Sequence, residues 1–232
     1  MAGEMENKFE TNVPKLVTEQ GDNILYPFSP PIFQSKVDPK FIEDLLNEGS
    51  KLTREKDDWR EKLAGNMKYG GSYIYKDDFI VKSEPYLLTY IERFFDKITD
   101  NFGDKQIARL MDVQTNRRER KNGNMRLDTM WINYQHKHDF NPPHTHRGAL
   151  SFVIFCKVPK QIFKEQAVSN SKDAGKIMFQ YGEQTHPLVG NLYPVEPYEG
   201  LFLVFPANMN HLVPSFWCDE ERISVAGNFV VV

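Results

Sequence analysis

The sequence predicts a mainly β protein of the α+β class, in which two helices precede a sandwich or barrel of short strands. Two observations carry this prediction. Apolar residues recur every three or four positions in two stretches before residue 104. From Lys105 onward the pattern changes to short β-type runs, and these runs are separated by Gly, Pro and Asn. Helices followed by a series of short strands are typical of α+β proteins built around a sandwich or barrel.

Length and composition fit one compact domain, with residues 1–104 as supporting elements and residues 105–232 as the β core. The chain has 232 residues, of which 40% are hydrophobic, so it can bury a substantial core. A net charge of −3 provides no overall positive field for nucleic acid or an anionic membrane. The longest apolar runs are strand-sized and the N-terminus lacks a signal pattern, so we expect a cytoplasmic protein without a membrane segment. Two cysteines are too few for a disulfide framework or a thiolate metal site.

The first elements along the chain are an arm and a helix. Three prolines in LYPFSPPIF indicate that residues 1–34 form an extended arm over the body, because proline interrupts both helix and strand. Asp38 followed by Pro39 predicts a helix start, since aspartate caps free backbone donors and proline suits the first helical position. Apolar residues at helical spacing extend this helix from residue 39 to about residue 55.

A turn and a second helix follow. Gly70 and Gly71 are expected to form the turn. The second helix is predicted over residues 84–102, where the apolar residues again recur every three or four positions. Ser83 is the expected N-cap of this helix, and Gly103 is expected to end it.

Six β-type runs form the expected core. They are QIARLMDV (106–113), RLDTMWINYQ (126–135), ALSFVIFCKV (149–158), KIMFQY (176–181), GLFLVF (200–205) and RISVAGNFVVV (222–232). Asn122 and Gly123 between the first two runs are a typical hairpin signal. The cluster NRRERKNGNMR around this turn lacks the interleaved aromatics of a nucleic-acid site, so we interpret it as a solvated turn.

A histidine-rich segment carries the strongest functional signal. Four of the six histidines lie within WINYQHKHDFNPPHTHRGALSFVIF. Residues at i and i+2 of an extended segment share a face, so His144 and His146 can point into the same space. Imidazole is a ligand for divalent iron, and a third ligand is predicted at His211, just after the apolar run LFLVF. The remaining histidines, at positions 136, 138 and 186, are expected in loops.

The last run begins with a charged residue, Arg222, which requires an interaction partner if it is buried. Arg222, Ser224, Ala226 and Asn228 alternate onto one face of this predicted strand. An arginine in an apolar strand needs an anionic partner, and a guanidinium aided by the Ser224 hydroxyl suits a dicarboxylate ligand. Asn133 lies on another predicted strand of the core.

These motifs together resemble a known family. The order WxN, NxxHxH, a serine-containing apolar strand, FPxxxxH and eRISxxxN is similar to the 2-oxoglutarate- and iron(II)-dependent oxygenases of bacteria and their phages, within the prolyl-hydroxylase-like superfamily. The resemblance covers residues 125–230. It implies a double-stranded β-helix, a jelly roll of the cupin-like kind, with the N-terminal helices packed on one sheet. It also implies oxygen-dependent decarboxylation of 2-oxoglutarate to succinate, coupled to hydroxylation of a small-molecule or peptidyl substrate, for example a peptidyl or free amino acid.

The resemblance also assigns residues to the site. Fe(II) is expected at His144, His146 and His211, and no further catalytic residue is expected beyond these ligands. The far carboxylate of 2-oxoglutarate is expected at Arg222 and Ser224, assisted by either Asn133 or Tyr134, which face opposite ways on their strand. Asn228 is expected near the mouth. It stands where the nucleic-acid dealkylating members of the superfamily carry a second arginine, which argues against a repair function.

One departure from the family pattern leaves alternatives open. The superfamily places a carboxylate two residues after the first histidine, whereas this sequence has His146 there. His146 itself, a nearby acid such as Asp139, or water could complete the iron site, and the strand geometry favours His146. A three-histidine site also occurs in cupin-type dioxygenases that do not use 2-oxoglutarate, and a non-catalytic cupin-like binding module is a further alternative. The loops over residues 159–176 and 181–200 carry no motif, so the substrate and the oligomeric state are left open.

Overall fold

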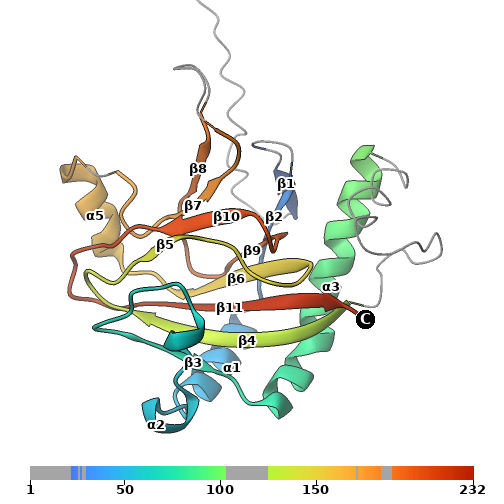
Figure 1. The fold of residues 1–232 in the computed structure, drawn as a ribbon, viewed down its shortest axis with the longest axis horizontal. Coiled ribbons are helices and arrows are strands. Elements are labelled where there is room, and N and C mark those ends of the chain that lie inside the picture. Colours follow the sequence, from blue (N-terminus) through green and yellow to red (C-terminus); the bar gives the residue numbers. More distant parts are fainter. Residues whose placement is uncertain (1–21, 26, 28–29, 103–124, 171, 184–189) are drawn as a thin grey trace, which may run out of the picture.

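A computed structural model describes residues 22–25, 27, 30–102, 125–170, 172–183 and 190–232 (Figure 1). Its larger sheet contains β1 (Asn23–Leu25), β2 (Ile32–Lys36), β3 (Gly71–Ile74), β4 (Met125–Gln135), β6 (Leu150–Lys157), β9 (Leu201–Pro206) and β11 (Arg222–Val231). Its smaller sheet contains β5 (Asn141–His144), β7 (Ile177–Gln180), β8 (Leu192–Val195) and β10 (Asn210–Val213). The strand order is β1-β2-β9-β6-β11-β4-β3 in the seven-stranded sheet and β5-β10-β7-β8 in the four-stranded sheet.

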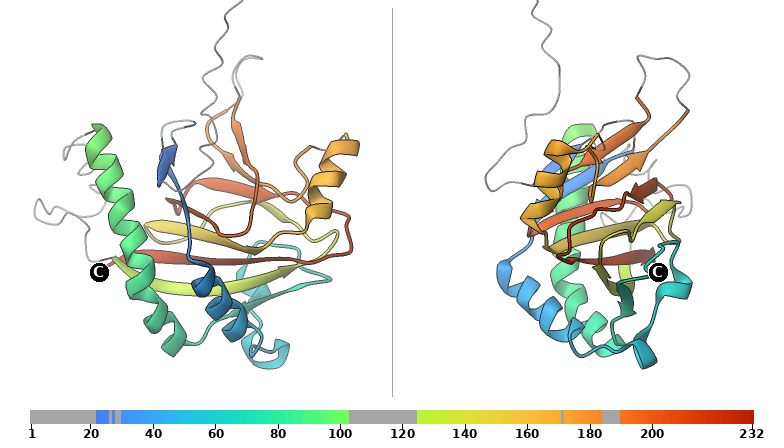
Figure 2. Two further views of the ribbon diagram at one scale, coloured as in Figure 1. Left: turned by 180° about the vertical axis from the view of Figure 1, so that it is seen from behind. Right: turned by 90° about the vertical axis from the view of Figure 1, so that its left-hand side faces the viewer.

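The helices are α1 (Pro39–Gly49), α2 (Arg54–Asp57), α3 (Asp77–Phe102) and α5 (Lys160–Val168), with a 3₁₀ turn at Arg60–Lys62. Helices α1 and α3 cover one face of the seven-stranded sheet, and the four-stranded sheet faces its other side (Figure 2). The predicted class, α+β and mainly β with a double-stranded β-helix backed by N-terminal helices, is therefore confirmed. None of the helices in the described ranges is long and apolar enough to cross a membrane.

Two buried clusters explain why the central strands are apolar on both faces. Alternate residues of β6, such as Phe152 and Ile154, pack against the helices, whereas Val153 and Phe155 pack against the smaller sheet. Strand β9 alternates in the same way. A strand covered on both faces has no polar face, so β6 and β9 appear in the sequence as continuous apolar runs.

Both predicted helices have different bounds in the structure. The first ends at Gly49, because Ser50 caps it, and a separate short helix begins at Arg54 rather than continuing the first to residue 55. The second helix begins at Asp77, so the predicted N-cap at Ser83 is wrong. The buried side chains of Phe79 and Ile80 extend the apolar stripe toward the N-terminus, and burial of this stripe outweighs the interruption by Pro85 inside the helix.

The N-terminal arm contains two strands, contrary to the prediction made from its prolines. Strand β2 begins directly after Pro31 and pairs with β9, with Phe33 opposite Val204. Strand β1 pairs with β2 in turn. The expectation that residues 1–34 lack regular strand is wrong for residues 23–25 and 32–34, because the three prolines lie between β1 and β2 in the sequence and interrupt neither strand.

The predicted turn at Gly70 and Gly71 is also the start of a strand. Strand β3 begins at Gly71 and pairs with β4. A Cβ atom on Gly70 would lie 1.8 Å from the carbonyl oxygen of Tyr134, so only glycine allows the two backbones to approach this closely. The predicted strand over residues 106–113, the hairpin signal at Asn122 and Gly123, and the end of the second helix at Gly103 lie outside the described residues, as does His186.

Candidate metal and 2-oxoglutarate site

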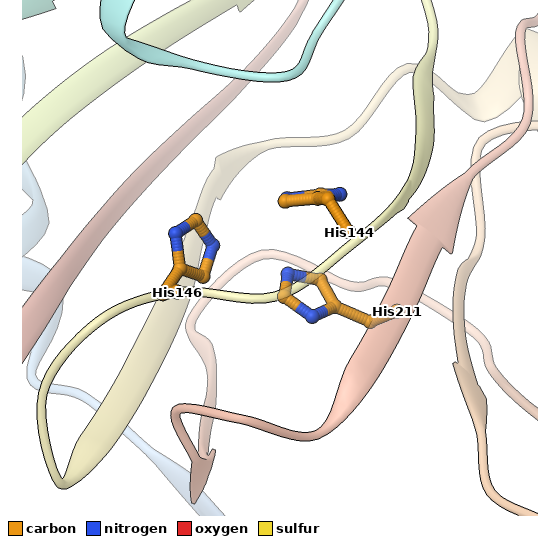
Figure 3. Close-up of side chains that lie close together, drawn as sticks. All are labelled: His144, His146 and His211. Carbon is orange, nitrogen blue, oxygen red and sulfur yellow. The ribbon is translucent and has the colours of Figure 1, made fainter.

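The three predicted metal ligands lie together at the facing ends of two strands of the smaller sheet. His144 is the last residue of β5, His146 follows two residues later, and His211 lies in β10 directly opposite His144. The candidate ligand atoms of the three side chains all lie within 4.8 Å of one another. Figure 3 shows the three rings converging on one space. The sequence spacing predicted the first pair, and the antiparallel pairing of β5 with β10 adds the third ring.

Backbone carbonyls fix which nitrogen of two rings can bind a metal. Nδ1 of His144 lies 2.7 Å from the carbonyl oxygen of Pro142, and Nδ1 of His211 lies 3.0 Å from the carbonyl oxygen of Met209. A carbonyl only accepts, so each Nδ1 carries the proton and each Nε2 keeps its lone pair. Hydrogen bonds of this kind orient metal-binding histidines, because they fix the tautomer and the ring plane.

The surroundings keep the three imidazoles neutral. Burial lowers the pKa of His144, lowers the pKa of His146 to about 4 and lowers the pKa of His211 to about 3. Phe205 and Trp131 form apolar walls, with ring centroids 4.9 Å from His211 and 5.6 Å from His146 respectively. Metal ligation requires the unprotonated ring, so these shifts favour cation binding at neutral pH.

A narrow cavity of about 50 Å³ joins the three imidazoles to the predicted anion site. Arg222, Ser224 and Asn133 line this cavity together with the three histidines. Residues 63–65 and Met67, from the segment that follows the 3₁₀ turn, line it as well. The cavity therefore contains both predicted halves of the site, the metal ligands on the smaller sheet and the polar residues on the larger one.

Arg222 is a buried cation with neutral partners. Its side chain donates one hydrogen bond to the carbonyl of Gly175 and one to the side-chain oxygen of Gln135. Its Nε atom is buried without a hydrogen-bond partner in the described part of the chain. The neighbouring Glu221 pairs with His136 and Lys157 instead. Burial lowers the pKa of Arg222 to about 10, so the group stays charged at neutral pH.

A buried charge without a counter-ion is costly, which makes this guanidinium a strong indication of an anionic ligand. Two of its five N–H groups bond protein atoms, and the other three can bind a carboxylate. Together with the neutral imidazoles, this donor set fits a divalent cation and an organic acid bound side by side in one cavity.

Strand register decides between Asn133 and Tyr134. Asn133 pairs with Ser224 of β11 and with Ser72 of β3, and its side-chain oxygen accepts a hydrogen bond of 2.7 Å from the Ser72 hydroxyl. The adjacent Tyr134 contacts Tyr73, with ring centroids 5.8 Å apart, and is not among the residues that line the cavity. Burial raises the pKa of Tyr134 to about 12. Of the two alternatives, Asn133 is the one that reaches the cavity.

Asn228 does not line the cavity. It faces the same way as Ser224 along β11, but its side chain bonds Ser151 and Thr129 at 2.7 and 3.2 Å. Its amide therefore connects three neighbouring strands of the larger sheet.

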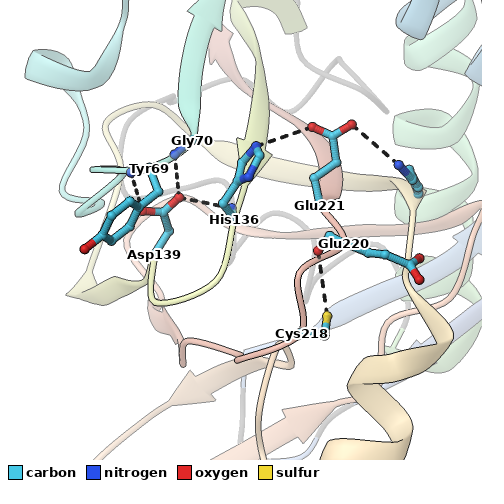
Figure 4. Close-up of polar contacts among 8 residues, drawn as sticks. Tyr69, Gly70, His136, Asp139, Cys218, Glu220 and Glu221 are labelled. Atoms are coloured by element: carbon cyan, nitrogen blue, oxygen red, sulfur yellow. Dashed lines mark hydrogen bonds and ion pairs between the residues drawn. The ribbon is translucent and has the colours of Figure 1, made fainter.

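Asp139 has a different role from the one considered for it. Its buried carboxylate accepts hydrogen bonds from the backbone N–H groups of Tyr69, Gly70 and His136, at 2.8 to 3.0 Å (Figure 4). It does not belong to the group of candidate metal ligands found among the described residues. The carboxylate ties the start of β3 to the turn between β4 and β5. His138, in the same turn, is exposed, as expected for a loop histidine.

Two features of the site were not anticipated from the sequence. Gln135 contacts Arg222, and the segment of residues 63–67 forms part of the cavity wall. The position of Gln135, two residues after Asn133 on a predicted strand, would have placed it on the same face. Nothing in the local sequence of residues 63–67 indicates a role in the site. A hydrogen-bonded bridge between Asn66 and Phe140, which are far apart in the sequence, brings this segment beside β5.

Comparison with known proteins gives one family match. Residues 129–228 match the family described as "Putative 2OG-Fe(II) oxygenase". No curated protein matches this sequence.

Several solved structures are similar. An oxidoreductase of the 2OG-Fe(II) oxygenase family from Burkholderia pseudomallei is 18% identical with a TM-score of 0.35, and the match covers 58% of this chain and 57% of that one. A prolyl-4-hydroxylase from Pseudomonas putida is 12% identical with a TM-score of 0.45, covering 87% and 92%. HygX from Streptomyces hygroscopicus, with nickel, 2-oxoglutarate and hygromycin B bound, is 10% identical with a TM-score of 0.48, covering 87% and 83%.

The matched family range extends from β4 to β11 and includes all three clustered histidines and Arg222. The family description names the metal and the cosubstrate that were expected from the sequence, Fe(II) and 2-oxoglutarate. The resemblance drawn from the sequence motifs is therefore confirmed, and residues 129–228 match the family of 2-oxoglutarate- and Fe(II)-dependent oxygenases.

Proposed function

We propose that this protein is a hydroxylase that uses 2-oxoglutarate and Fe(II), with a metal site made of three histidines. The observation that carries the proposal is the position of Arg222, a buried guanidinium without an acidic partner among the described residues, in the same cavity as His144, His146 and His211. A metal site alone would suit many functions. The buried cation beside it calls for an organic acid as well.

Three histidine side chains of this protein would bind the metal. Nε2 of His144 and Nε2 of His211 provide two lone pairs, and the ring of His146 provides the third. When bound, Fe(II) supplies the electron-transfer chemistry with molecular oxygen that protein side chains lack. Three neutral ligands leave the full positive charge of the metal in place, so an anionic cosubstrate is attracted more strongly than at a site with a carboxylate ligand.

Arg222, Ser224 and Asn133 are the proposed binding residues for the far carboxylate of 2-oxoglutarate. They line the wall of the larger sheet, opposite the strands that carry the histidines. Charge-assisted hydrogen bonds from Arg222 would supply most of the affinity, because such bonds are stronger than those between neutral groups. The Ser224 hydroxyl and the Asn133 side chain would orient the same carboxylate.

The substrate is proposed to reach the site across an open groove of about 380 Å³. Its lining residues are Asp58, Arg60, Glu61, Gly65, Asn66, Met67 and Lys68. Gly65 and Met67 line the cavity too, so the groove adjoins the proposed metal site. A groove of this size suits a small molecule or a peptidyl residue, in which a C–H bond would be hydroxylated.

The test combines reconstitution with one substitution. Anaerobically prepared protein should bind one Fe(II), and under air it should release succinate with oxygen uptake that requires 2-oxoglutarate. Arg222→Leu should keep the metal and lose this turnover. Arg126→Leu is the matched control, because Arg126 is exposed and pairs with Asp128 on the outside of β4. It should behave as the wild type.

Other outcomes would contradict the proposal. Iron-dependent oxygen uptake that is indifferent to 2-oxoglutarate would identify a three-histidine dioxygenase of the cupin type. Failure to bind Fe(II), Ni(II) or Mn(II) would leave a binding module without oxygenase chemistry. Full metal binding by His146→Gln would remove His146 from the metal site.

A further inference from the structure

Gln135 connects the proposed anion-binding arginine to the rest of the fold. It is the last residue of β4, it lies directly opposite Arg222 in the sheet, and only 3% of its surface is exposed. Its side-chain oxygen accepts a hydrogen bond from Nη2 of Arg222. Its side-chain nitrogen donates a hydrogen bond of 2.7 Å to the carbonyl of Asp139. The side-chain oxygen and the side-chain nitrogen of Gln135 are therefore both hydrogen-bonded.

The second contact of the guanidinium comes from the turn that precedes β7. The carbonyl of Gly175 accepts a hydrogen bond from Nη1 of Arg222. The guanidinium carbon also lies 5.3 Å from the ring centroid of Phe155. One amide, one carbonyl and one ring thus fix the orientation of the side chain, and all three are neutral.

Neutral partners have a specific consequence at this position. A glutamate at position 135 could reach the same guanidinium with almost the same shape, and the two groups would form an internal ion pair. The positive charge would then be compensated by the protein, leaving little attraction for an anionic ligand. Glutamine supplies the hydrogen bond that orients Arg222 without supplying the charge.

We infer that Gln135 is a positioning residue that orients Arg222 while leaving its charge uncompensated, and that it thereby sets the preference for a 2-oxo diacid over a 2-oxo monoacid. This inference rests on the proposed function of the site. Gln135 itself acts through Arg222, so its substitution should change how well the far carboxylate is recognised. It should not change how the metal is held, because the histidines lie on other strands.

The test measures binding rather than turnover. Protein loaded with Mn(II) is titrated anaerobically with 2-oxoglutarate and with 2-oxopentanoate, which has a methyl group in place of the far carboxylate. The ratio of the two dissociation constants reports recognition of that carboxylate. Affinity for Mn(II) alone is measured in parallel, and circular dichroism checks the fold.

In the wild type we expect 2-oxoglutarate to bind about 10- to 100-fold more tightly than 2-oxopentanoate, as for hydrogen bonds to charged groups. Gln135→Glu should reduce this ratio to within about threefold, because the introduced carboxylate pairs with Arg222. Gln135→Leu should lower 2-oxoglutarate affinity about tenfold through loss of orientation, and it should keep part of the preference for the diacid. Both variants should bind Mn(II) as the wild type does.

Ser35→Ala is the control. Ser35 is also a buried polar residue, and its hydroxyl donates a hydrogen bond of 2.5 Å to Asp22, but it lies on β2 and does not line the cavity. Its substitution should leave the ratio unchanged.

The binding measurements distinguish failure of this inference from failure of the proposed function. If the wild type binds neither acid, the proposed function fails. If the wild type prefers the diacid and Gln135→Glu keeps that preference, the function stands and the role of Gln135 is refuted. If Gln135→Glu does not fold, Gln135→Leu decides, because 2-oxoglutarate affinity equal to that of the wild type would also refute the role.

Discussion

Acidification should destabilise the metal-free protein through the buried imidazoles. The pKa of His146 is about 4 and that of His211 is about 3 in the folded state, against 6.5 for an exposed histidine. Between these values the unfolded chain binds protons that the folded chain cannot. Stability that is complete above pH about 6.5 is therefore lost as the pH falls, and the loss levels off near the folded pKa values.

The size of the effect follows from the pKa of the unfolded chain. At a pH about one unit below 6.5, each histidine that stays neutral in the fold costs about 1.4 kcal/mol. His146 and His211 together should then lower the free energy of unfolding by about 3 kcal/mol between pH about 7.5 and about 5.5. This loss of unfolding free energy does not depend on how far the two folded-state pKa values are lowered, provided that both lie well below the lower pH.

Urea unfolding in the presence of a chelator measures this difference, with tryptophan fluorescence as the signal. The double variant His146→Gln/His211→Gln should lose about 3 kcal/mol less than the wild type over the same pH range. His138→Gln is the control, because His138 is exposed in a loop and should not alter the difference. A double variant that loses as much stability as the wild type would refute the reasoning.

Two substitutions test other parts of the site. Ser224→Ala should weaken 2-oxoglutarate binding to Mn(II)-loaded protein about 2- to 10-fold in anaerobic calorimetry, because it removes one neutral hydrogen bond; unchanged affinity would exclude Ser224 from the binding site. Asp139→Asn should lower the free energy of unfolding by about 2–4 kcal/mol in urea, because an amide oxygen cannot serve all three backbone donors that the carboxylate now accepts. The control for the second change is Asp219→Asn, at an exposed ion pair with Lys137, where we expect almost no effect. Equal losses from the two aspartates would contradict the structural role of Asp139.

The strands of the core could be predicted from the sequence because their composition follows directly from their burial. The runs that became β4, β6, β7, β9 and β11 are largely apolar or alternate over part of their length, and the predicted bounds agree with the structure to within a residue or two. Strands β3, β5, β8 and β10 were missed, since each has only four residues and lacks the continuous apolar run IMF that marks the equally short β7. Four residues are too few for a periodic pattern, so their pairing partners decide that they are strands.

The site was predicted as far as local geometry allowed. The i and i+2 spacing placed His144 and His146 on one face, and the alternation of β11 placed Ser224 with Arg222. The choice between Asn133 and Tyr134 needed the register of β4 against β11. The role of Asp139 needed the position of β3, which is distant in the sequence.

The sequence by itself determined the order of helices and strands, the clustering of imidazoles and the presence of an arginine that requires an anion. These are properties of single segments, because the periodicity and the chemistry of the side chains can be read from each segment alone. Only the tertiary structure decided that His211 faces His144, that Gln135 orients Arg222 and that residues 63–67 form part of the cavity wall. Each of these is a contact between segments far apart in the chain, and such contacts depend on strand register and packing, which local patterns do not contain.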